Sequence, residues 1–414
     1  MKLKWLYNTV IRCYGAGIAL VSPWNKKAKL WILGRKNIFE RLAAQIDHKA
    51  PIIWMHVASL GEFEQGRPII EKIKEQHPEY KILLTFFSPS GYEIRKNYPG
   101  AEYIFYLPLD TRANARKFLD IVKPEMAIFI KYEFWVDMLR ELNCRDIPTY
   151  IVSAIFRRNS MFFSPIGGLW REALGYYKTI FVQDSDSKDI LAELNCHHVV
   201  VAGDTRFDRV AQIAAAAKKI DLIEQFKGDN QLLVAGSTWD KDEELIVELA
   251  NNHPEVKFII APHEMDEGRM AKIASRAAGG AIRYTQADNS LCDKQILILD
   301  TIGMLSSVYS YANFAYIGGG FGVGIHNTLE AATFGLPIAF GPNYHKFKEA
   351  RDMIALGAAT SISNYSELQA WFYPLYSDLN YLEKRSEIAK LYTAQNQGAT
   401  EKFLQSVLCK TDAK

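Results

Sequence analysis

The chain has 414 residues, which is too long for one ordinary hydrophobic core and therefore predicts two domains. Hydrophobic residues make up 49% and charged residues 23%, the proportions of a folded protein rather than a disordered one. A net charge of +2 without a nucleic-acid-binding motif argues against a nucleic-acid partner. Five scattered cysteines without a C-x-x-C pair favour a reducing compartment and argue against a zinc site.

Residues 1–45 form a basic and apolar N-terminal segment. It carries nine lysines and arginines against one acid, Glu40, and the stretch from Trp5 to Trp24 is largely apolar. Arg12 within this stretch makes a membrane-spanning helix costly, and the stretch lacks a good signal-peptide cleavage site. We expect a helix that lies at an anionic membrane surface. The alternative is a helix that packs on the protein itself.

From residue 46 the chain alternates short apolar stretches with helical segments, which is typical of βαβ units and parallel sheets. A first series fills residues 46–207, with strands predicted at Ile52–Val57, Lys81–Phe87, Glu102–Tyr106, Met126–Ile130, Thr149–Val152, Thr179–Val182 and His198–Val201. A second fills residues 231–378, with strands predicted at Leu232–Ala235, Lys257–Ala261, Ile296–Leu299, Phe314–Ile317 and Ile338–Phe340. Residues 208–230 are predicted to be a helical connector, and residues 379–414 to be C-terminal helices. We expect two Rossmann-like domains facing a cleft, with ligands at the carboxyl ends of the strands.

The stretch from Gly318 to Gly324 has the composition of a phosphate-binding loop. It follows the predicted strand Phe314–Ile317 and precedes Asn327 and Glu330. Glycine lets the backbone approach a ligand closely, and a helix N-terminus offers free N–H groups to an anion. The spacing fits neither a dinucleotide fingerprint nor a Walker loop. Asn327 and Glu330 also fit a helix-capping pair, and Glu330 serves both purposes only if one carboxylate oxygen stays free.

Three charged residues follow predicted strands of the first series. Glu62 follows the carboxyl end of the first predicted strand, where a carboxylate can act as a general base if burial and neighbouring groups give it a suitable pKa. Alternatively, it is an acid in the first turn of the next helix. Glu133 suits charge stabilisation or a helix start. Arg206 suits a phosphate contact or a surface ion pair.

In the second series, the loops Gly236–Thr238, Pro262–Glu264 and Asp300–Met304 also follow predicted strands. Together with the glycine loop we expect them to form one nucleotide pocket. Two D-x-D strings, at 184–186 and 240–242, lie at predicted helix starts, where acids are favoured anyway, so we expect no metal there.

These blocks, in this order, resemble the Kdo transferases, the 3-deoxy-D-manno-octulosonic acid transferases of lipopolysaccharide synthesis. The blocks are HVASLGE, KYEFW, GDTRFD, AGSTWDKDEE, APHE, DTIGML and GGGFGVGIHNTLEAATFGLPIAFGP. The likeness runs from the N-terminal segment to about residue 350. It implies the two-domain GT-B glycosyltransferase fold with an N-terminal membrane-associated helix, at the cytoplasmic face of the cell inner membrane. The implied reaction moves Kdo from CMP-Kdo to a lipid A precursor, lipid IVA.

The resemblance also implies residue roles. Glu62 matches the proton acceptor, and Glu133 and Arg206 match positions that stabilise the transition state. CMP would be bound by Pro262, His263, Ile302, Gly303, Met304, Asn327, Thr328, Leu329 and Glu330. No metal or other cofactor is implied beyond the donor CMP-Kdo. Departures from the family pattern are Arg206 in place of a common lysine, Met304 in place of a frequent glutamate and Thr328 in place of a common proline.

A base that faces the leaving group across the anomeric carbon predicts a single displacement with inversion. Two other functions fit the same pattern. One is another GT-B-fold glycosyltransferase or epimerase that uses a UDP-sugar. The other is a non-catalytic, membrane-bound sensor of nucleotide sugars.

Overall fold

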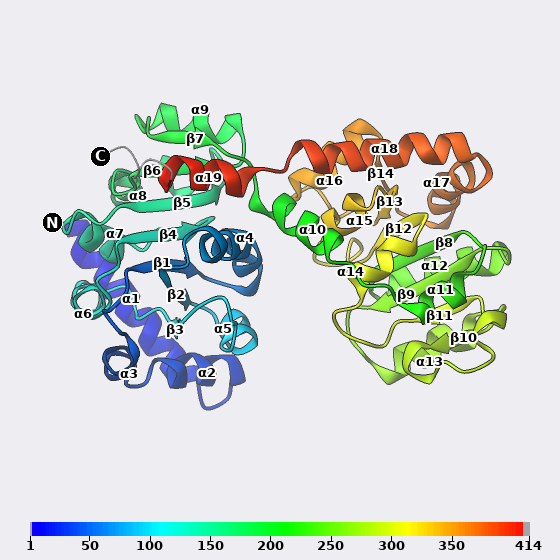
Figure 1. Cartoon of the computed structure of the whole chain (residues 1–414), viewed down its shortest axis with the longest axis horizontal. Coiled ribbons are helices and arrows are strands. Elements are labelled where there is room, and N and C mark those ends of the chain that lie inside the picture. The colour runs from blue at the N-terminus through cyan, green and yellow to red at the C-terminus, as the bar shows by residue number, and fades with distance from the viewer. Residues whose placement is uncertain (1, 409–414) are drawn as a thin grey trace. The chain divides into compact units, whose positions relative to one another are not determined.

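The computed structural model describes residues 2–408, without the side chains of residues 2–4. The side chains of Lys2 and Lys4, and residues 409–414 of the predicted C-terminal helices, lie outside the described part. The chain divides into two units (Figure 1). Unit 1 comprises residues 1–209 and 398–414, and unit 2 comprises residues 210–397.

Unit 1 is built on a seven-stranded sheet in the order β3-β2-β1-β4-β5-β6-β7, and all its pairings are parallel. Its strands are β1 (Ile52–Val57), β2 (Lys81–Phe86), β3 (Tyr103–Tyr106), β4 (Met126–Ile130), β5 (Thr149–Ala154), β6 (Thr179–Val182) and β7 (Val199–Val201). Its helices are α1 (Lys2–Val21), α2 (Lys26–Arg35), α3 (Ile38–Gln45), α4 (Leu60–Gln76), α5 (Pro89–Arg95), α6 (Arg112–Val122), α7 (Val136–Asn143), η1 (Met161–Phe163), α8 (Gly168–Leu174), α9 (Ser185–Glu193), the first turn of α10 (Thr205–Ala215), and α19 (Ala399–Val407).

Unit 2 is built on a second seven-stranded parallel sheet, in the order β10-β11-β9-β8-β12-β13-β14. Its strands are β8 (Leu232–Thr238), β9 (Lys257–Pro262), β10 (Ala281–Arg283), β11 (Ile296–Ile298), β12 (Phe314–Ile317), β13 (Ile338–Phe340) and β14 (Ala359–Ser361). Its helices are α11 (Asp221–Lys227), α12 (Asp240–Asn252), α13 (Glu267–Arg276), η2 (Tyr284–Gln286), η3 (Leu291–Asp293), α14 (Leu305–Val308), η4 (Tyr309–Tyr311), α15 (Leu329–Thr333), α16 (Lys348–Leu356), α17 (Tyr365–Ser377) and α18 (Leu379–Gln395).

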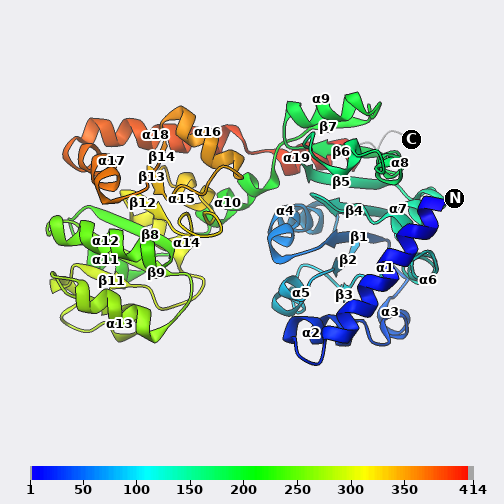
Figure 2. The same ribbon diagram turned by 180° about the vertical axis from the view of Figure 1, so that it is seen from behind.

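Helices cover both faces of each sheet, so the central strands are buried on both sides (Figures 1 and 2). This is why β1 and β4 are apolar almost throughout, and every residue of both strands is buried. The helix that follows β1 begins with an N-cap, Ser59, which accepts a hydrogen bond from the Glu62 N–H. The alternation predicted from the sequence is therefore a doubly wound α/β fold in each unit.

The N-terminal helix α1 packs one face against unit 1 and leaves the other exposed. Tyr7 donates a hydrogen bond to Asp110 at 2.5 Å, and Asn8 donates one to Asp137 at 2.7 Å. The opposite face exposes large apolar side chains, among them Trp5, Val10, Leu20 and Val21. Among residues 2–408, no helix combines the length and apolar character that crossing a bilayer requires.

Candidate functional site

The carboxyl ends of β1 and β4 lie side by side in unit 1. The two strands pair in parallel, with His56 opposite Phe129, and the strand order reverses between them. In open α/β sheets such a switch point opens a crevice between the loops that follow the two strands. Glu62 follows β1 and Glu133 follows β4, so both predicted carboxylates come from the loops at this point.

Glu62 is half-buried in the first turn of α4. Its Oε2 atom accepts a hydrogen bond from the backbone N–H of Ala58 at 2.5 Å. Burial, and next the negative charge of Glu133, raise the pKa of Glu62 to about 7, while the Ala58 N–H and the charge of Lys131 act in the opposite direction. The first-turn position predicted for Glu62 is confirmed, and its raised pKa is one that suits a general base near neutral pH; the base itself stays a prediction.

Glu133 is buried and lies before α7 rather than in its first turn, so the interpretation as a helix-start acid is wrong. Its Oε2 atom accepts hydrogen bonds from His56 Nε2, at 3.0 Å, and from the indole N–H of Trp135. Tyr177 donates to its backbone carbonyl. The carboxylate is thus held in one orientation from two sides.

His56 belongs to a buried polar chain that the sequence reasoning did not identify. Its side chain is fully buried, with Nδ1 2.9 Å from the hydroxyl of Thr85. That hydroxyl also accepts a hydrogen bond from the indole of Trp54 at 2.8 Å. An ionised Glu133 only accepts, so the Nε2 atom of His56 carries the proton between them. The sequence does contain a signal for this chain, because a histidine in an otherwise apolar buried strand needs polar partners.

Arg206 lies at the start of α10 and is half-buried. Its Nε atom donates to the buried Asp204 at 2.8 Å, so part of the guanidinium is used in an ion pair. Tyr132 lies near this pair and near Glu62. Burial raises the pKa of its hydroxyl, whose electrostatic neighbours include Arg206, Asp204 and Glu62. Arg206 therefore contributes positive charge to the part of unit 1 that holds Glu62.

In unit 2 the glycine loop follows β12, next to β8, where the order of that sheet reverses. Gly318 and Gly319 have no room for a side chain: a Cβ at Gly318 would lie 2.3 Å from the carbonyl oxygen of Ser237, and Gly319 has φ +90. The buried carboxylate of Asp242 accepts hydrogen bonds from the Gly319 N–H, at 2.9 Å, and from the Tyr316 hydroxyl, at 2.7 Å. The second D-x-D string thus ends in a residue that anchors the loop.

The segment after the loop differs in detail from the predicted helix cap. The helix α15 begins at Leu329 with Thr328 at the N-cap position, although the Asn327 side chain does accept a hydrogen bond from the Leu329 N–H at 3.1 Å. Asn327 donates to one carboxylate oxygen of Glu330 at 2.9 Å, and Ser306 donates to the other at 2.6 Å. Each oxygen of Glu330 therefore already has a partner, and a ligand would share or displace one of them.

Two further loops of unit 2 carry the remaining predicted residues. Pro262 ends β9, and the ring of His263 packs against the rings of Trp239 and His326, at centroid distances of 5.0 and 4.3 Å. The ring of His326 links β9 to the glycine loop, and burial and His263 lower its pKa.

The loop after β11 has a different character. The side chain of Ile302 is 91% exposed, and Gly303, with φ +88, has open space beside it. Met304 is the N-cap residue of α14, and its sulfur accepts a hydrogen bond from Thr301 at 3.1 Å.

Comparisons with solved structures find proteins of similar fold. A UDP-GlcNAc 2-epimerase from Neisseria meningitidis matches 86% of this chain and 100% of its own, with a TM-score of 0.64 at 17% identity. MurG from Acinetobacter baumannii matches 86% of this chain and 99% of its own, with a TM-score of 0.56 at 13% identity. Two parallel sheets and these neighbours define a GT-B-like α/β protein.

Comparisons of sequence find relatives over most of the chain. Residues 36–209 match the family model described as 3-deoxy-D-manno-octulosonic-acid transferase (kdotransferase). The chain is 25% identical over 351 residues to the 3-deoxy-D-manno-octulosonic acid transferase of Aquifex aeolicus, covering 82% of this chain and 91% of the relative. It is 23% identical to that of Haemophilus influenzae, covering 85% of each. The chain is thus a relative of the Kdo transferases over most of its length, as its motifs indicated.

Proposed function

We propose that the protein is an inverting glycosyltransferase that moves Kdo from CMP-Kdo to a lipid A precursor, lipid IVA. In support, relatives that match 82% to 89% of the chain are named 3-deoxy-D-manno-octulosonic acid transferases. The observation that carries the proposal is the pKa of Glu62, raised to about 7 at the switch point of unit 1. A carboxylate with this pKa is partly ionised at neutral pH and is a stronger base than an ordinary glutamate.

In the proposed mechanism, Glu62 removes the proton from an acceptor hydroxyl, and the oxygen attacks the anomeric carbon of Kdo. The bond to CMP breaks as the new bond forms, so the configuration inverts. Glu133 raises the pKa of Glu62 through its charge, and Arg206 offsets negative charge that develops in the transition state.

The donor is assigned to unit 2, to the loops that carry Pro262, His263, the range 302–304 and the range 327–330. The backbone of the glycine loop and Asn327 would receive the phosphate, and Glu330 would receive polar groups of the nucleoside. The tight backbone packing at Gly318 supports a loop whose shape is fixed before the ligand binds.

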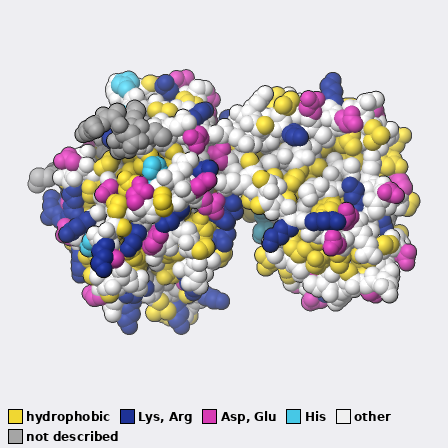
Figure 3. Space-filling model, in the orientation of Figure 1, with side chains coloured by type: hydrophobic (Ala, Val, Ile, Leu, Met, Phe, Trp, Pro, Cys, Tyr) yellow, Lys and Arg dark blue, Asp and Glu magenta, His cyan; other side chains and the backbone are white. Residues whose placement is uncertain are grey.

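We also propose that the protein works at the cytoplasmic face of the inner membrane. The exposed apolar face of α1 and the exposed lysines of α2 suit an anionic lipid surface. Figure 3 shows lysine and arginine side chains along the edge of unit 1 where α2 and α3 lie.

The test is to incubate the purified protein with CMP-Kdo and lipid IVA and to measure the acceptor by mass spectrometry. We expect CMP release together with a mass gain of one or more Kdo residues. If UDP raises the melting temperature of the protein and CMP does not, the protein is instead an enzyme that uses UDP-sugars. Binding of CMP-Kdo without turnover would indicate a sensor.

A further inference from the structure

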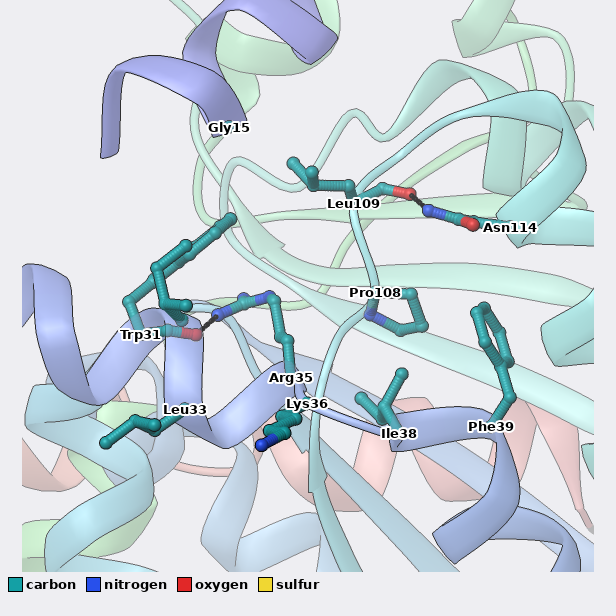
Figure 4. Close-up of a pocket in the computed structure, with 11 residues that line it drawn as sticks. Gly15, Trp31, Leu33, Arg35, Lys36, Ile38, Phe39, Pro108, Leu109 and Asn114 are labelled. Atoms are coloured by element: carbon teal, nitrogen blue, oxygen red, sulfur yellow. Dashed lines mark hydrogen bonds between the residues drawn. The ribbon is translucent and has the colours of Figure 1, made fainter. Parts of the chain in front are cut away.

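A cavity of about 380 Å³ lies in unit 1 between α1, α2, α3 and the segment that follows β3. Its wall is mostly apolar and includes Trp31, Leu33, Ile38, Phe39, Pro108 and Leu109. Figure 4 shows Ile38, Phe39 and Pro108 on one side of the space, with Leu109 above and Trp31 opposite. Its volume is within the range of clefts that bind small ligands.

The mouth of this cavity is basic. Arg35 and the exposed Lys36 line it, and Lys26, Lys27 and Lys29 are exposed on α2, the helix that ends just before Lys36. That helix has no acidic residue in its sequence. An apolar cavity beside a row of cations complements a ligand with an apolar chain and an anionic head.

Arg35 fixes the shape of the cavity. Its guanidinium lies 3.8 Å from the ring centre of Trp31 and donates to the carbonyls of Leu107 and Phe87, at 2.8 and 2.9 Å. These carbonyls follow β3 and β2, so α2 is tied to the carboxyl edge of the sheet. The cavity therefore lies at the carboxyl edge of the sheet, the edge from which the loops with Glu62 and Glu133 also extend.

A continuous row of aromatic rings connects the cavity with the candidate carboxylates. The rings of Trp31 and Phe87 are 5.9 Å apart, and those of Phe87 and Trp135 are 4.7 Å apart. Trp135 in turn donates its indole N–H to Glu133. Packed aromatic side chains thus link the cavity to the candidate carboxylates.

We propose that this cavity binds one fatty acyl chain of the lipid acceptor, with the lysines of α2 near the acceptor's anionic groups. The assignment rests on the proposed transferase function for the identity of the acceptor. It requires more than adsorption of α1 to a lipid surface: one chain leaves the bilayer and enters the protein. Since burial of each methylene is worth about fourfold in affinity, acyl length then sets acceptor binding.

The test uses dodecanoyl lysophosphatidic acid with a diazirine near the chain end, below its micelle concentration, and the full-length protein without donor. After irradiation, we expect labelled peptides from residues 31–39 and 107–114. Excess unlabelled dodecanoyl lysophosphatidic acid should abolish this labelling, and glycerol 3-phosphate, which has the head but no chain, should leave it. Labelling confined to the exposed face of α1 would overturn the proposal.

Two substitutions of one residue sharpen the test. Leu109→Trp fills the cavity and should reduce labelling by about tenfold or more, whereas Leu109→Ala enlarges it and should retain labelling. The matched control is Leu20→Trp, which adds the same group on the exposed face of α1, where Leu20 is 73% exposed. Equal labelling of Leu109→Trp and wild type would contradict the assignment. Loss of labelling in Leu109→Ala, with an unchanged melting temperature, would contradict it too.

The experiment separates the cavity from the proposed function because it needs no turnover. Site-specific labelling in a protein that does not transfer Kdo would support the cavity and reject the reaction. Transfer of Kdo together with cavity-independent labelling would support the reaction and reject the cavity.

Discussion

The Nε2 atom of His56 lies 3.0 Å from the carboxylate of Glu133, in the buried interior of unit 1. His56 is the fifth residue of β1, and Glu133 follows the neighbouring strand β4. Behind the histidine, Thr85 and Trp54 continue the hydrogen-bonded chain into the core. The orientation of Glu133, and through its charge the pKa of Glu62, thus depends on a side chain that does not need to touch substrate.

Replacement of His56 by Phe preserves the ring and removes the hydrogen bond. We expect His56→Phe to lower kcat by about tenfold or more, because a hydrogen bond to a charged group contributes about 1.5–3 kcal/mol. The KM for CMP-Kdo should change little, since the donor is assigned to unit 2. Steady-state kinetics with each substrate varied measure both values. Trp54→Phe removes the first link of the same chain and is the control; an equal loss in both variants would show that core packing, not the carboxylate, is affected.

The rate of the wild-type enzyme should rise with pH through about 7 and then level off, because Glu62 must lose its proton to act as a base. Glu133→Gln removes a negative charge that raises this pKa. The normalised profile of the variant should therefore shift to lower pH, although its maximal rate is lower. A profile that keeps its midpoint, or shifts to higher pH, would contradict the coupling of the two carboxylates.

The same raised pKa has a consequence for stability. Glu62 binds its proton more tightly in the folded protein than at its ordinary value of 4.5, so folding loses stability as pH rises from about 4.5 through about 7. Glu62→Gln cannot ionise. We expect the melting temperature of Glu62→Gln, relative to that of wild type, to increase as pH rises over this range. Calorimetry at constant ionic strength measures both. Parallel curves would mean that the pKa of Glu62 is not raised.

Asp242 should matter for nucleotide binding without touching the nucleotide. Asp242→Asn leaves one acceptor oxygen where the carboxylate accepts from the Gly319 N–H, the Trp239 N–H and the Tyr316 hydroxyl, so the anchor of the glycine loop is weakened. We expect CMP to bind about tenfold more weakly by titration calorimetry, with a lower melting temperature. Asp240→Asn is the matched control because Asp240 lies on the surface of the same helix and pairs with Arg269 at 2.9 Å. Unchanged CMP affinity in Asp242→Asn would remove the loop from the donor site.

The resemblance to the Kdo transferases implies a reaction without metal. Dialysis against EDTA should leave the transfer rate unchanged, and addition of Mg²⁺ should not increase it. A loss of activity that Mg²⁺ restores would assign the metal a role that the resemblance does not include.

Much of the fold could be predicted because buried parallel strands are continuous apolar runs. The strands Ile52–Val57, Met126–Ile130, Thr179–Val182, Phe314–Ile317 and Ile338–Phe340 have the predicted bounds. Strands β10 and β14 escaped prediction because they are three-residue edge strands, only partly buried and without an apolar run. The connector is helical as predicted, and it contains two helices with a break at 216–220.

After unit 2 the chain returns to unit 1, and the local sequence does not predict this return. The helix α19 packs Phe403 and Leu404 into the core of unit 1, and Asp208 accepts hydrogen bonds from the Gly398 and Thr400 N–H groups. Its amphipathic pattern predicts a helix but not the surface that it covers.

Of the candidate site, the sequence could place Glu62 and Glu133 at the ends of strands. It could not show that the strands are neighbours, since that depends on sheet order. Nor could it pair His56 with Glu133, because the contact depends on register and side-chain rotamers. At Glu330 the sequence predicted the partner Asn327 but not Ser306, which lies on the separate helix α14.

The central claim is that Glu62 is the base of a Kdo transferase, and turnover of Glu62→Gln tests it most directly. The measurement is kcat with saturating CMP-Kdo and lipid IVA, beside Glu64→Gln, a control on the same helix whose carboxylate pairs with Arg95 and Arg209. We predict a loss of at least about a hundredfold for Glu62→Gln with the fold retained, and a nearly normal rate for Glu64→Gln. A normal rate for Glu62→Gln would contradict the account.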